Sequence, residues 1–451
     1  MFHYFLDFAY RIVWGPPLLI MLIGIGVYFT IALRGLQLRM LPRALRLAFG
    51  KQERSEHGDL THFQSLMTAL AATLGIGNLS GVATALMAGG VGALFWMWVM
   101  ALLGMIVKYA EAILAVKYRI IDARGEQAGG PMYSIERGLG WKWLAVLFAA
   151  FTLLASLGGG NILQANTVAD ALASEFGIAP LSTGIAMAGL IALAIFGGIH
   201  SIGRVASLLV PLMTGFYLLG GAMILAQHLP EIPGALWSIV SHALTPSAAF
   251  GGFIGATLAD SIRVGLSRGL MTSEAGLGTA AIASAAAKTE CPAKQALVSM
   301  SGGFLATGLM CTVTALVLIV TGAYGSLDSN GLPLNGAAMT LNAFERALPW
   351  GSQGVVVTIA LFGFTTVLAY AYYAEKCLEY LVGERGIPFY RALFVCMVVI
   401  GSVTELEIVW KFSDIANGLM AYPNLIGLIA LRRVVVDETK RLLPETSDQV
   451  D

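Results

Sequence analysis

The sequence has few charges: Asp, Glu, Lys and Arg make up only 12% of its 451 residues. Soluble domains carry about 25% charged residues, and a chain of this length with so few charges could not cover a surface facing water. The composition therefore excludes a soluble enzyme, a nucleic-acid-binding protein and a disordered chain. The formal net charge is zero, from 27 basic and 27 acidic residues, so the total identifies no partner.

Cysteine and histidine are also scarce. The four cysteines, Cys291, Cys311, Cys377 and Cys396, show no CxxC spacing, and the six histidines are scattered. These spacings indicate no metal cluster, and we interpret the cysteines as buried apolar thiols. The start of the chain lacks the basic segment and the small-residue cleavage site of a signal peptide.

Hydrophobic residues are abundant, at 57% of the chain, and they recur in stretches long enough to cross a membrane. About 20 residues of helix span the roughly 30 Å hydrocarbon core, and lipid requires a helix because no water satisfies the backbone there. We therefore predict an all-α polytopic membrane protein with about 11 transmembrane helices. They are expected near 14–33, 63–88, 91–116, 141–168, 178–198, 205–228, 248–287, 296–322, 353–374, 389–404 and 408–431.

The basic residues predict the orientation, since cytoplasmic loops carry an excess of Lys and Arg. With the N-terminus outside and the C-terminus in the cytoplasm, strict alternation leaves only Arg11, Arg346 and Lys411 on the outer side. The three remaining basic residues, Lys108, Arg263 and Arg268, lie within or beside spanning segments. This asymmetry requires an odd number of helices.

Two of the predicted spans are interrupted. Residues Thr73–Gly81 contain three glycines and an asparagine at mid-membrane, which make a poor helix interior. Residues Gly265–Gly278 are too polar for one straight span. The sequence Gly75–Asn78 in the first segment is echoed by Gly276–Thr279 in the second. Interrupted helices at matching positions of two halves indicate a transporter binding site.

The similarity between the two interrupted segments also predicts the domain organisation. Setting aside the first helix leaves five helices in each half, and five is odd, so the two halves have opposite membrane orientation. We predict an extra helix and cytoplasmic loop at 1–60, a first inverted repeat at 61–230, a second at 246–431 and a cytoplasmic tail at 432–451. The broken segments are then core helices one and six.

Unwound backbone within a membrane needs partners. The N-terminus of a half-helix offers free N–H donors and a positive partial charge, which suit a carboxylate, and freed carbonyls suit a dehydrated cation. An amino acid with a sodium ion would satisfy both. The alternative is that the glycines only allow close helix packing.

At these residues the chain resembles the alanine/glycine:cation symporter family, also called sodium:alanine symporters. The resemblance covers nearly the whole chain, in order. It is carried by Trp14–Leu18, Gly75–Ala85, Phe95–Trp98, Lys108–Ala112, Ala115–Arg119, Gly129–Tyr133, Gln164–Asn166, Arg268–Gly269, Glu274–Gly278 and Ala285–Thr289.

The resemblance implies a fold similar to that of the bacterial leucine transporter, in the inner membrane of a prokaryotic cell. It implies import of alanine, glycine and, in some members, D-alanine together with Na+. The expected partners are the amino acid and membrane lipid, with no nucleic acid.

The resemblance also implies a substrate site. The residues are Thr73, Gly75, Ile76, Gly77, Asn78, Gln164, Leu270, Met271, Thr272, Thr366 and Tyr370. The N–H groups of Ile76 and Gly77 would hold the carboxylate, and carbonyls of the two breaks would face the amine. Gln164 would be a polar contact, while Thr366 and Tyr370 would close the pocket.

For sodium, the resemblance implies the carbonyls of Ala71, Leu74 and Phe362 and the hydroxyls of Thr365 and Thr366. Hard oxygen ligands suit such a cation. A second ion site would use Asn78 and Thr73.

Three positions depart from the family pattern, which usually has Thr at Ile76, Trp at Tyr370 and Asn at Ser273. A hydroxyl is thus missing beside the carboxylate position, and the pocket wall is smaller and gains a phenol. These departures bear on substrate size and on the second ion site.

Several polar residues have simpler interpretations. Glu274 and Asp260 would form salt bridges with the nearby Arg268 or Arg263, and Lys108 would pair with Glu111 on one helical face. The hydroxyls of Thr365 and Thr366 could bond to their own helix, and Gln164 could join two helices.

The leading hypothesis is a sodium-coupled importer of small neutral amino acids that works by alternating access. The alternative within the same class is a proton-coupled carrier that uses Glu274. A membrane-embedded enzyme lacks a catalytic constellation in the sequence, and a channel lacks a charged filter.

Overall fold

The computed structural model describes residues 2–50, 58–244, 257–327, 331–404 and 406–442. The first half of the chain contains α1 (Phe2–Val13), α2 (Pro16–Ala32), α3 (Leu36–Arg39), α4 (Leu41–Phe49), α5 (His62–Thr73), α6 (Val82–Gly89), α7 (Ala93–Lys117), α8 (Pro131–Leu139), α9 (Lys142–Leu157), α10 (Leu163–Phe176), α11 (Pro180–Phe196), α12 (Gly198–Gln227) and α13 (Ile232–Ser241). The second contains α14 (Leu258–Ser273), α15 (Thr279–Ala285), α16 (Pro292–Gly303), α17 (Thr312–Val320), α18 (Gly336–Ala347), α19 (Gly351–Val382), α20 (Ile387–Ser402), α21 (Leu406–Ala430) and α22 (Arg432–Leu442).

Shorter elements interrupt these helices. Three are π-helical: η1 (Gly77–Gly81), η2 (Gly158–Ile162) and η4 (Phe304–Cys311). Two are single 3-10 turns, η3 (Leu229–Glu231) and η5 (Glu384–Gly386). The two-residue strands β1 (Ile120–Ile121) and β2 (Gln127–Ala128) pair antiparallel after α7. Apart from this small hairpin, the described chain is helical, as predicted.

Seven helices in the described part of the chain are long and apolar enough to cross a membrane, and nine do so if each bent helix pair counts as one span. Two predicted spans are not among the nine. The α11 helix is apolar but has only 17 residues. The α14 helix has 16 residues and α15 has 7, with residues 274–278 between them, and the start of this predicted range, 248–256, lies outside the described residues. The count of eleven, the repeat boundaries and the orientation of the termini stay predictions.

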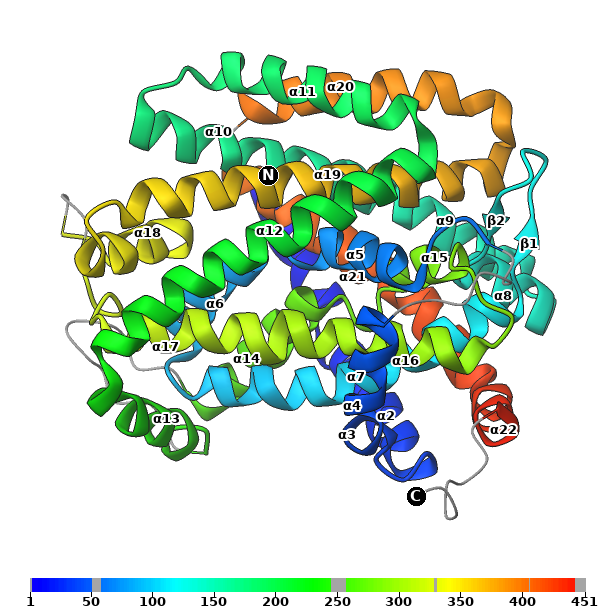
Figure 1. The fold of residues 1–451 in the computed structure, drawn as a ribbon, viewed down its shortest axis with the longest axis horizontal. Helices are drawn as coiled ribbons and strands as arrows, with labels where there is room; N and C mark the ends of the chain where they lie inside the picture. Colours follow the sequence, from blue (N-terminus) through cyan, green and yellow to red (C-terminus); the bar gives the residue numbers. More distant parts are fainter. Residues whose placement is uncertain (1, 51–57, 245–256, 328–330, 405, 443–451) are drawn as a thin grey trace.

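The helices pack in layers (Figure 1). The α10, α11, α19 and α20 helices lie along one side, and α7, α14 and α16 lie along the opposite side, with α5 between them. The α5 helix packs on both α12 and α19, and α7 packs on both α14 and α16. The interrupted elements therefore lie inside the bundle, where neighbouring helices can satisfy their backbone.

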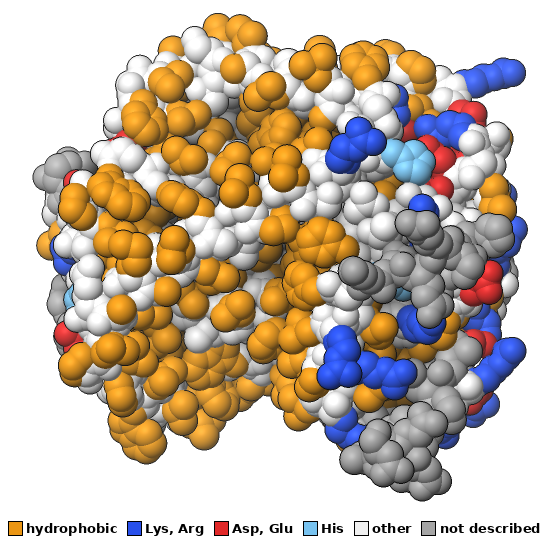
Figure 2. Space-filling model, in the orientation of Figure 1, with side chains coloured by type: hydrophobic (Ala, Val, Ile, Leu, Met, Phe, Trp, Pro, Cys, Tyr) orange, Lys and Arg blue, Asp and Glu red, His pale blue; other side chains and the backbone are white. Residues whose placement is uncertain are grey.

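The outer surface is apolar over a broad band (Figure 2). Large side chains such as Phe196 and Phe389 are 76% and 77% exposed, which is expected only where the surface faces lipid or a partner. Charged side chains gather instead at the edge where Figure 1 shows β1, β2, α8 and α22. This distribution is that of a multi-pass membrane protein.

Both interrupted helices begin in the same way. The Thr61 hydroxyl accepts from the Gln64 N–H at 3.1 Å, and the Thr61 N–H donates to Gln64 Oε1 at 3.0 Å, at the start of α5. Thr257 and Asp260 form the same capping box at the start of α14, at 3.1 and 3.3 Å. Such reciprocal bonds satisfy the orphan N–H groups of a helix start.

The β1–β2 hairpin is joined to the end of α19 by buried charges, here called the hairpin ion-pair network. The Lys376 ammonium lies 2.6 Å from Asp122, 2.9 Å from Glu126 and 3.2 Å from Glu379. Arg124 lies 3.0 Å from Glu375. Burial alone would raise the pKa of the Asp122 carboxyl, but the hydrogen bonds that it accepts from Lys376 and the Glu126 N–H outweigh burial and lower that pKa.

We predict that Lys376→Met destabilises the fold, because it leaves three carboxylates around an empty centre. Removing one partner of a buried ion pair costs about 3–5 kcal/mol of unfolding free energy, measurable as a lower thermal unfolding temperature in detergent. Lys142→Met is the matched control, since the Lys142 side chain is 75% exposed and lies 3.7 Å from Glu136, and such a pair contributes at most about 1 kcal/mol. Equal melting temperatures of the two variants would contradict the prediction.

Candidate functional site

The first break lies between α5 and η1, where the helix axes bend by 55°. Leu74 leaves the helical region at φ −84° and ψ 72°, and its N–H still donates to Leu70 O at 2.6 Å. Among the described residues, the N–H groups of Gly75 and Ile76 have no acceptor. The first break therefore presents free backbone donors inside a buried site.

Side chains from two other helices converge on Gly75. A Cβ at this position would lie 3.0 Å from Thr366 Oγ1 of α19 and 3.6 Å from Gln164 Oε1 of α10. The Gln164 amide nitrogen donates to Gly159 O at 3.0 Å, while its oxygen is buried and has no partner in the described chain. Thr366 donates across the helices to Ala71 O at 2.9 Å. The unpaired N–H groups of Gly75 and Ile76 and the unpaired side-chain oxygen of Gln164 therefore lie in the same small region.

The second break lies between α14 and α15. Glu274 has a left-handed backbone at φ 52°, and Gly276 and Gly278 follow at φ 86° and 78°. Glycine adopts this conformation freely, whereas a glutamate does so only at a cost in strain. Strain of this kind persists where the surrounding structure holds the residue in place.

The Glu274 carboxylate joins the two breaks. It is 3% exposed and accepts from the Tyr370 hydroxyl of α19 and from the Thr279 hydroxyl at 3.2 Å. The Thr73 hydroxyl at the end of α5 lies at 3.5 Å and also accepts from the buried Lys108 ammonium at 3.3 Å. Side chains of α5, α15 and α19 therefore meet at one acidic side chain.

Glu111 and Asn424 hold the backbone of the second break. Glu111 Oε1 of α7 accepts from the Gly278 N–H at 3.2 Å and from the Asn424 amide of α21 at 2.6 Å. The same amide donates to Gly276 O at 2.9 Å. Because the helix is interrupted, the Gly278 N–H and the Gly276 carbonyl have no intrahelical partner, and these side chains provide the hydrogen bonds that a buried backbone needs.

The structure also corrects several expected pairings. Lys108 and Glu111 do not pair with each other, since Lys108 faces Thr73 and Glu111 faces Gly278. Glu274 binds hydroxyls and not Arg268, whereas Asp260 does pair with Arg263, at 3.5 Å. Sequence spacing identified the charged residues but not the direction of their side chains.

The predicted sodium ligands fall into two groups. Ala71 O and Thr366 Oγ1 are in contact across helices, as above. Thr365 Oγ1 instead bonds to its own helix, at 3.0 Å from Leu361 O and 3.1 Å from Phe362 O. Leu74 lies at the break itself. Helix back-bonding therefore describes Thr365 but not Thr366.

The remaining predicted residues border the breaks on other sides. The Asn78 amide nitrogen donates to Ala306 O of η4 at 3.2 Å, and its buried oxygen has no partner in the described chain. The Thr272 hydroxyl lies 3.1 Å from that of Thr307. Of the other predicted substrate residues, Ile76 packs its side chain beside Gly363, and a Cβ on Gly77 would meet open space. In the second break, Leu270 O accepts a hydrogen bond from the Ser273 hydroxyl, and Met271 Sδ accepts one from Arg268.

One part of the site was missed in the sequence, the π-helical η2 between α9 and α10. A Cβ on Gly160 would lie 2.2 Å from Tyr370 Cγ, so the aromatic ring requires a glycine here. Gly159 supplies the carbonyl that binds Gln164. The run Gly158–Gly160 was a visible signal, because π-bulges are frequent at functional sites.

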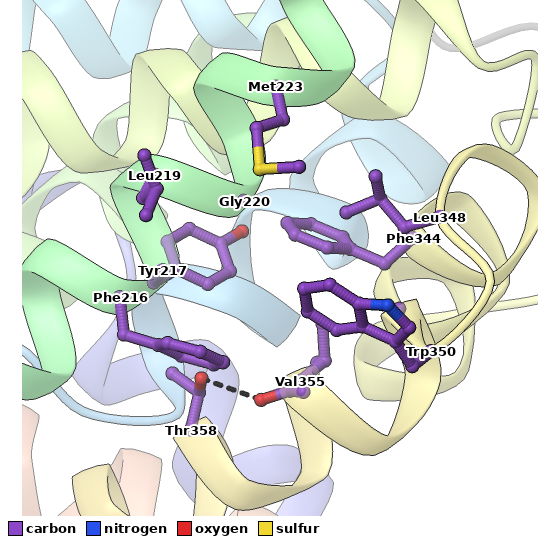
Figure 3. Close-up of a pocket in the computed structure, with 12 residues that line it drawn as sticks. Phe216, Tyr217, Leu219, Gly220, Met223, Phe344, Leu348, Trp350, Val355 and Thr358 are labelled. Carbon is purple, nitrogen blue, oxygen red and sulfur yellow. Dashed lines mark hydrogen bonds between the residues drawn. The ribbon is translucent and has the colours of Figure 1, made fainter.

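Two other places are less suited to an amino acid or a metal. A cavity of about 40 Å³ between α12, α18 and α19 is lined by apolar rings, and the Thr358 hydroxyl on its wall donates to Gly354 O of its own helix at 2.8 Å (Figure 3). The carboxylates of Asp122, Glu379 and Glu384 lie close enough to hold an ion, but the first two already bind Lys376.

Broken helices that expose backbone groups to a buried polar site are typical of secondary transporters, and the fold of this chain is that of the leucine-transporter class. Residues 1–450 match the sodium:alanine symporter family, and the chain belongs to that family. It is a transporter and not an enzyme.

Similar proteins agree with this assignment. The chain is 50% identical, over 95% of its length and 94% of the relative, to the sodium/alanine symporter AgcS of Methanococcus maripaludis. It is 33% identical, over 96% and 89%, to the probable sodium/glutamine symporter GlnT of Bacillus subtilis. A solved Na+-coupled sialic acid symporter shares the fold, with a TM-score of 0.61, 13% identity and coverage of 93% and 92%.

We predict that Glu111→Ala impairs both stability and uptake, because the Gly278 N–H and the Asn424 amide lose their acceptor inside the protein. Each unsatisfied buried group costs about 1–3 kcal/mol. Glu111→Gln retains an acceptor oxygen and serves as the matched control. Thermal unfolding and substrate uptake in proteoliposomes measure the two effects, and wild-type behaviour of Glu111→Ala would refute the role of this side chain.

Proposed function

We propose that the protein is a sodium-coupled importer of small neutral amino acids, alanine and glycine, which works by alternating access. The observation that carries the proposal is the meeting of free N–H donors at Gly75 and Ile76 with the unpartnered Gln164 oxygen. A zwitterion offers a carboxylate to the donors and an ammonium to the acceptor, so its two charged ends match the two kinds of free group.

The surroundings of the first break favour a small side chain. Ile76 and Val168 pack at Gly363, the Tyr370 ring fills the space at Gly160, and Thr366 closes the remaining side. The substrate residues are proposed to be those expected from the sequence, with Asn78 and Thr272 on the side of the breaks that faces η4. The absence of a threonine hydroxyl at Ile76 leaves the backbone as the main ligand of the carboxylate.

Sodium is proposed to bind where Thr366 Oγ1 meets Ala71 O, with Leu74, Phe362 and Thr365 as the further oxygen donors. In the structure the hydroxyl donates its proton to the carbonyl; with an ion present, both oxygens would face the ion. The relatives AgcS, a sodium/alanine symporter, and GlnT, a probable sodium/glutamine symporter, support sodium as the coupling ion. The Asn78 oxygen is the main candidate ligand for a second ion.

The proton-coupled alternative rests on Glu274, a carboxylate buried between the two breaks. One carboxylate oxygen accepts a hydrogen bond from Tyr370 and the other accepts one from Thr279. The Lys108 ammonium donates to the Thr73 hydroxyl, which itself lies 3.5 Å from Glu274. We therefore propose that Glu274 links the moving helices and does not carry the coupling proton. Closure of both breaks around substrate and ion would make their binding mutually favourable.

We predict that sodium lowers the apparent Kd of alanine for the purified protein by about 5- to 150-fold, the usual range of such coupling. Binding assays in sodium and in choline buffers measure the ratio. In proteoliposomes, a sodium gradient at equal pH should drive concentrative uptake, whereas a pH gradient in choline should not. Uptake driven by the pH gradient and abolished by Glu274→Gln would favour the proton-coupled carrier.

Thr366→Ala should weaken apparent sodium affinity by about tenfold or more, because a hydroxyl ligand to a charged group is lost. Thr358→Ala is the matched control on the same helix, since that hydroxyl bonds only to Gly354 O among the described residues. Sodium-dependence curves of alanine uptake provide the measurement. Unchanged sodium affinity in Thr366→Ala would remove this residue from the proposed ion site.

A further inference from the structure

A cavity of about 670 Å³ lies between the N-terminal helices and α14, away from the two breaks. Such a volume is within the usual range of ligand pockets, roughly 300–1,000 Å³. Its walls come from α1, α2, α6 and α14. Nothing in the proposed transport site uses this space.

Three basic side chains line the cavity. Arg11, Arg263 and Arg268 line it, and the described lining contains no carboxylate. Arg263 lies 3.5 Å from Asp260, and the Arg268 guanidinium lies 6.0 Å from the centre of the Trp410 ring. Arg11 has no ion-pair partner in the described chain. An anion would therefore be attracted to these arginines.

The rest of the wall is apolar and reaches the lipid-facing surface. It includes Leu19 and Ile20 of α2 and Leu266 of α14, and Ile20 is 67% exposed. A second cavity of about 240 Å³ shares Ile20 and continues along α2 to Phe29. The helical stretch of α2 from Pro16 to Phe29 rises by about 20 Å, longer than the half-thickness of a hydrocarbon core of about 30 Å.

We propose that this groove binds one anionic phospholipid. The phosphate would lie among Arg11, Arg263 and Arg268, and an acyl chain would follow α2 past Ile20. The arginines alone would suit any small anion, but the apolar walls of the two neighbouring cavities, which reach the lipid-facing surface at Ile20, favour a lipid. Since α14 carries the second break, the lipid would hold this helix against α1 and α2.

Titration of the purified full-length protein with dioleoylphosphatidylglycerol, followed by native mass spectrometry, tests the proposal. Binding should be tighter than that of dioleoylphosphatidylcholine. The double variant Arg11→Gln/Arg263→Gln should bind phosphatidylglycerol about 25-fold more weakly, at roughly fivefold for each arginine near an anionic group. The double variant Arg137→Gln/Arg204→Gln, which removes two exposed arginines elsewhere, should bind as the wild type does.

A second variant tests the apolar part. Ile20→Trp fills the groove while keeping all three arginines, and it should also weaken phosphatidylglycerol binding. Unchanged binding in both Ile20→Trp and the Arg11/Arg263 variant would overturn the proposal. Binding of sn-glycerol 3-phosphate as tight as that of phosphatidylglycerol would also overturn it, because the site would then recognise a free anion.

Discussion

The structure depends on one constraint: backbone N–H and C=O groups inside a membrane need partners. Most of the chain meets it with uninterrupted helices. Where α5 and α14 stop, the partners must come from elsewhere. At the second break Glu111 and Asn424 supply them from α7 and α21. At the first break the N–H groups of Gly75 and Ile76 have no protein acceptor among the described residues, and this difference is the reason why we propose that the substrate binds there.

The polar groups inside the bundle also connect helices that the proposed alternating access would move relative to one another. Glu274 touches α5, α15 and α19 through hydroxyl groups, and Thr366 connects α19 to the end of α5. A hydroxyl can donate or accept, so such contacts can be exchanged for contacts to an ion or an ammonium group at low cost. The hairpin ion-pair network, by contrast, uses full charges at the end of α19, outside the apolar band.

The predictions from the sequence agree with the structure at the backbone of the first break, whereas the directions of several side chains were not predicted. The family motif at Gly75–Asn78 was identified from residues alone, and the structure has the predicted break there. The direction of the Asn78 amide toward η4, the bonding of Thr365 to its own helix and the separation of Lys108 from Glu111 follow from packing. These details depend on which neighbouring helix lies nearest, and periodicity along one helix does not contain that information.

By itself, the sequence determined the membrane class, the positions of the apolar segments and the two interruptions, because charge content, hydrophobic length and glycine placement act locally. Only the tertiary structure decided that Gln164 and Thr366 meet at Gly75, that the Tyr370 ring requires Gly160, and that Glu111 and Asn424 hold the second break. Those contacts join residues far apart in the chain, and they form because lipid excludes water and leaves each buried polar group to be satisfied by whichever helix lies beside it.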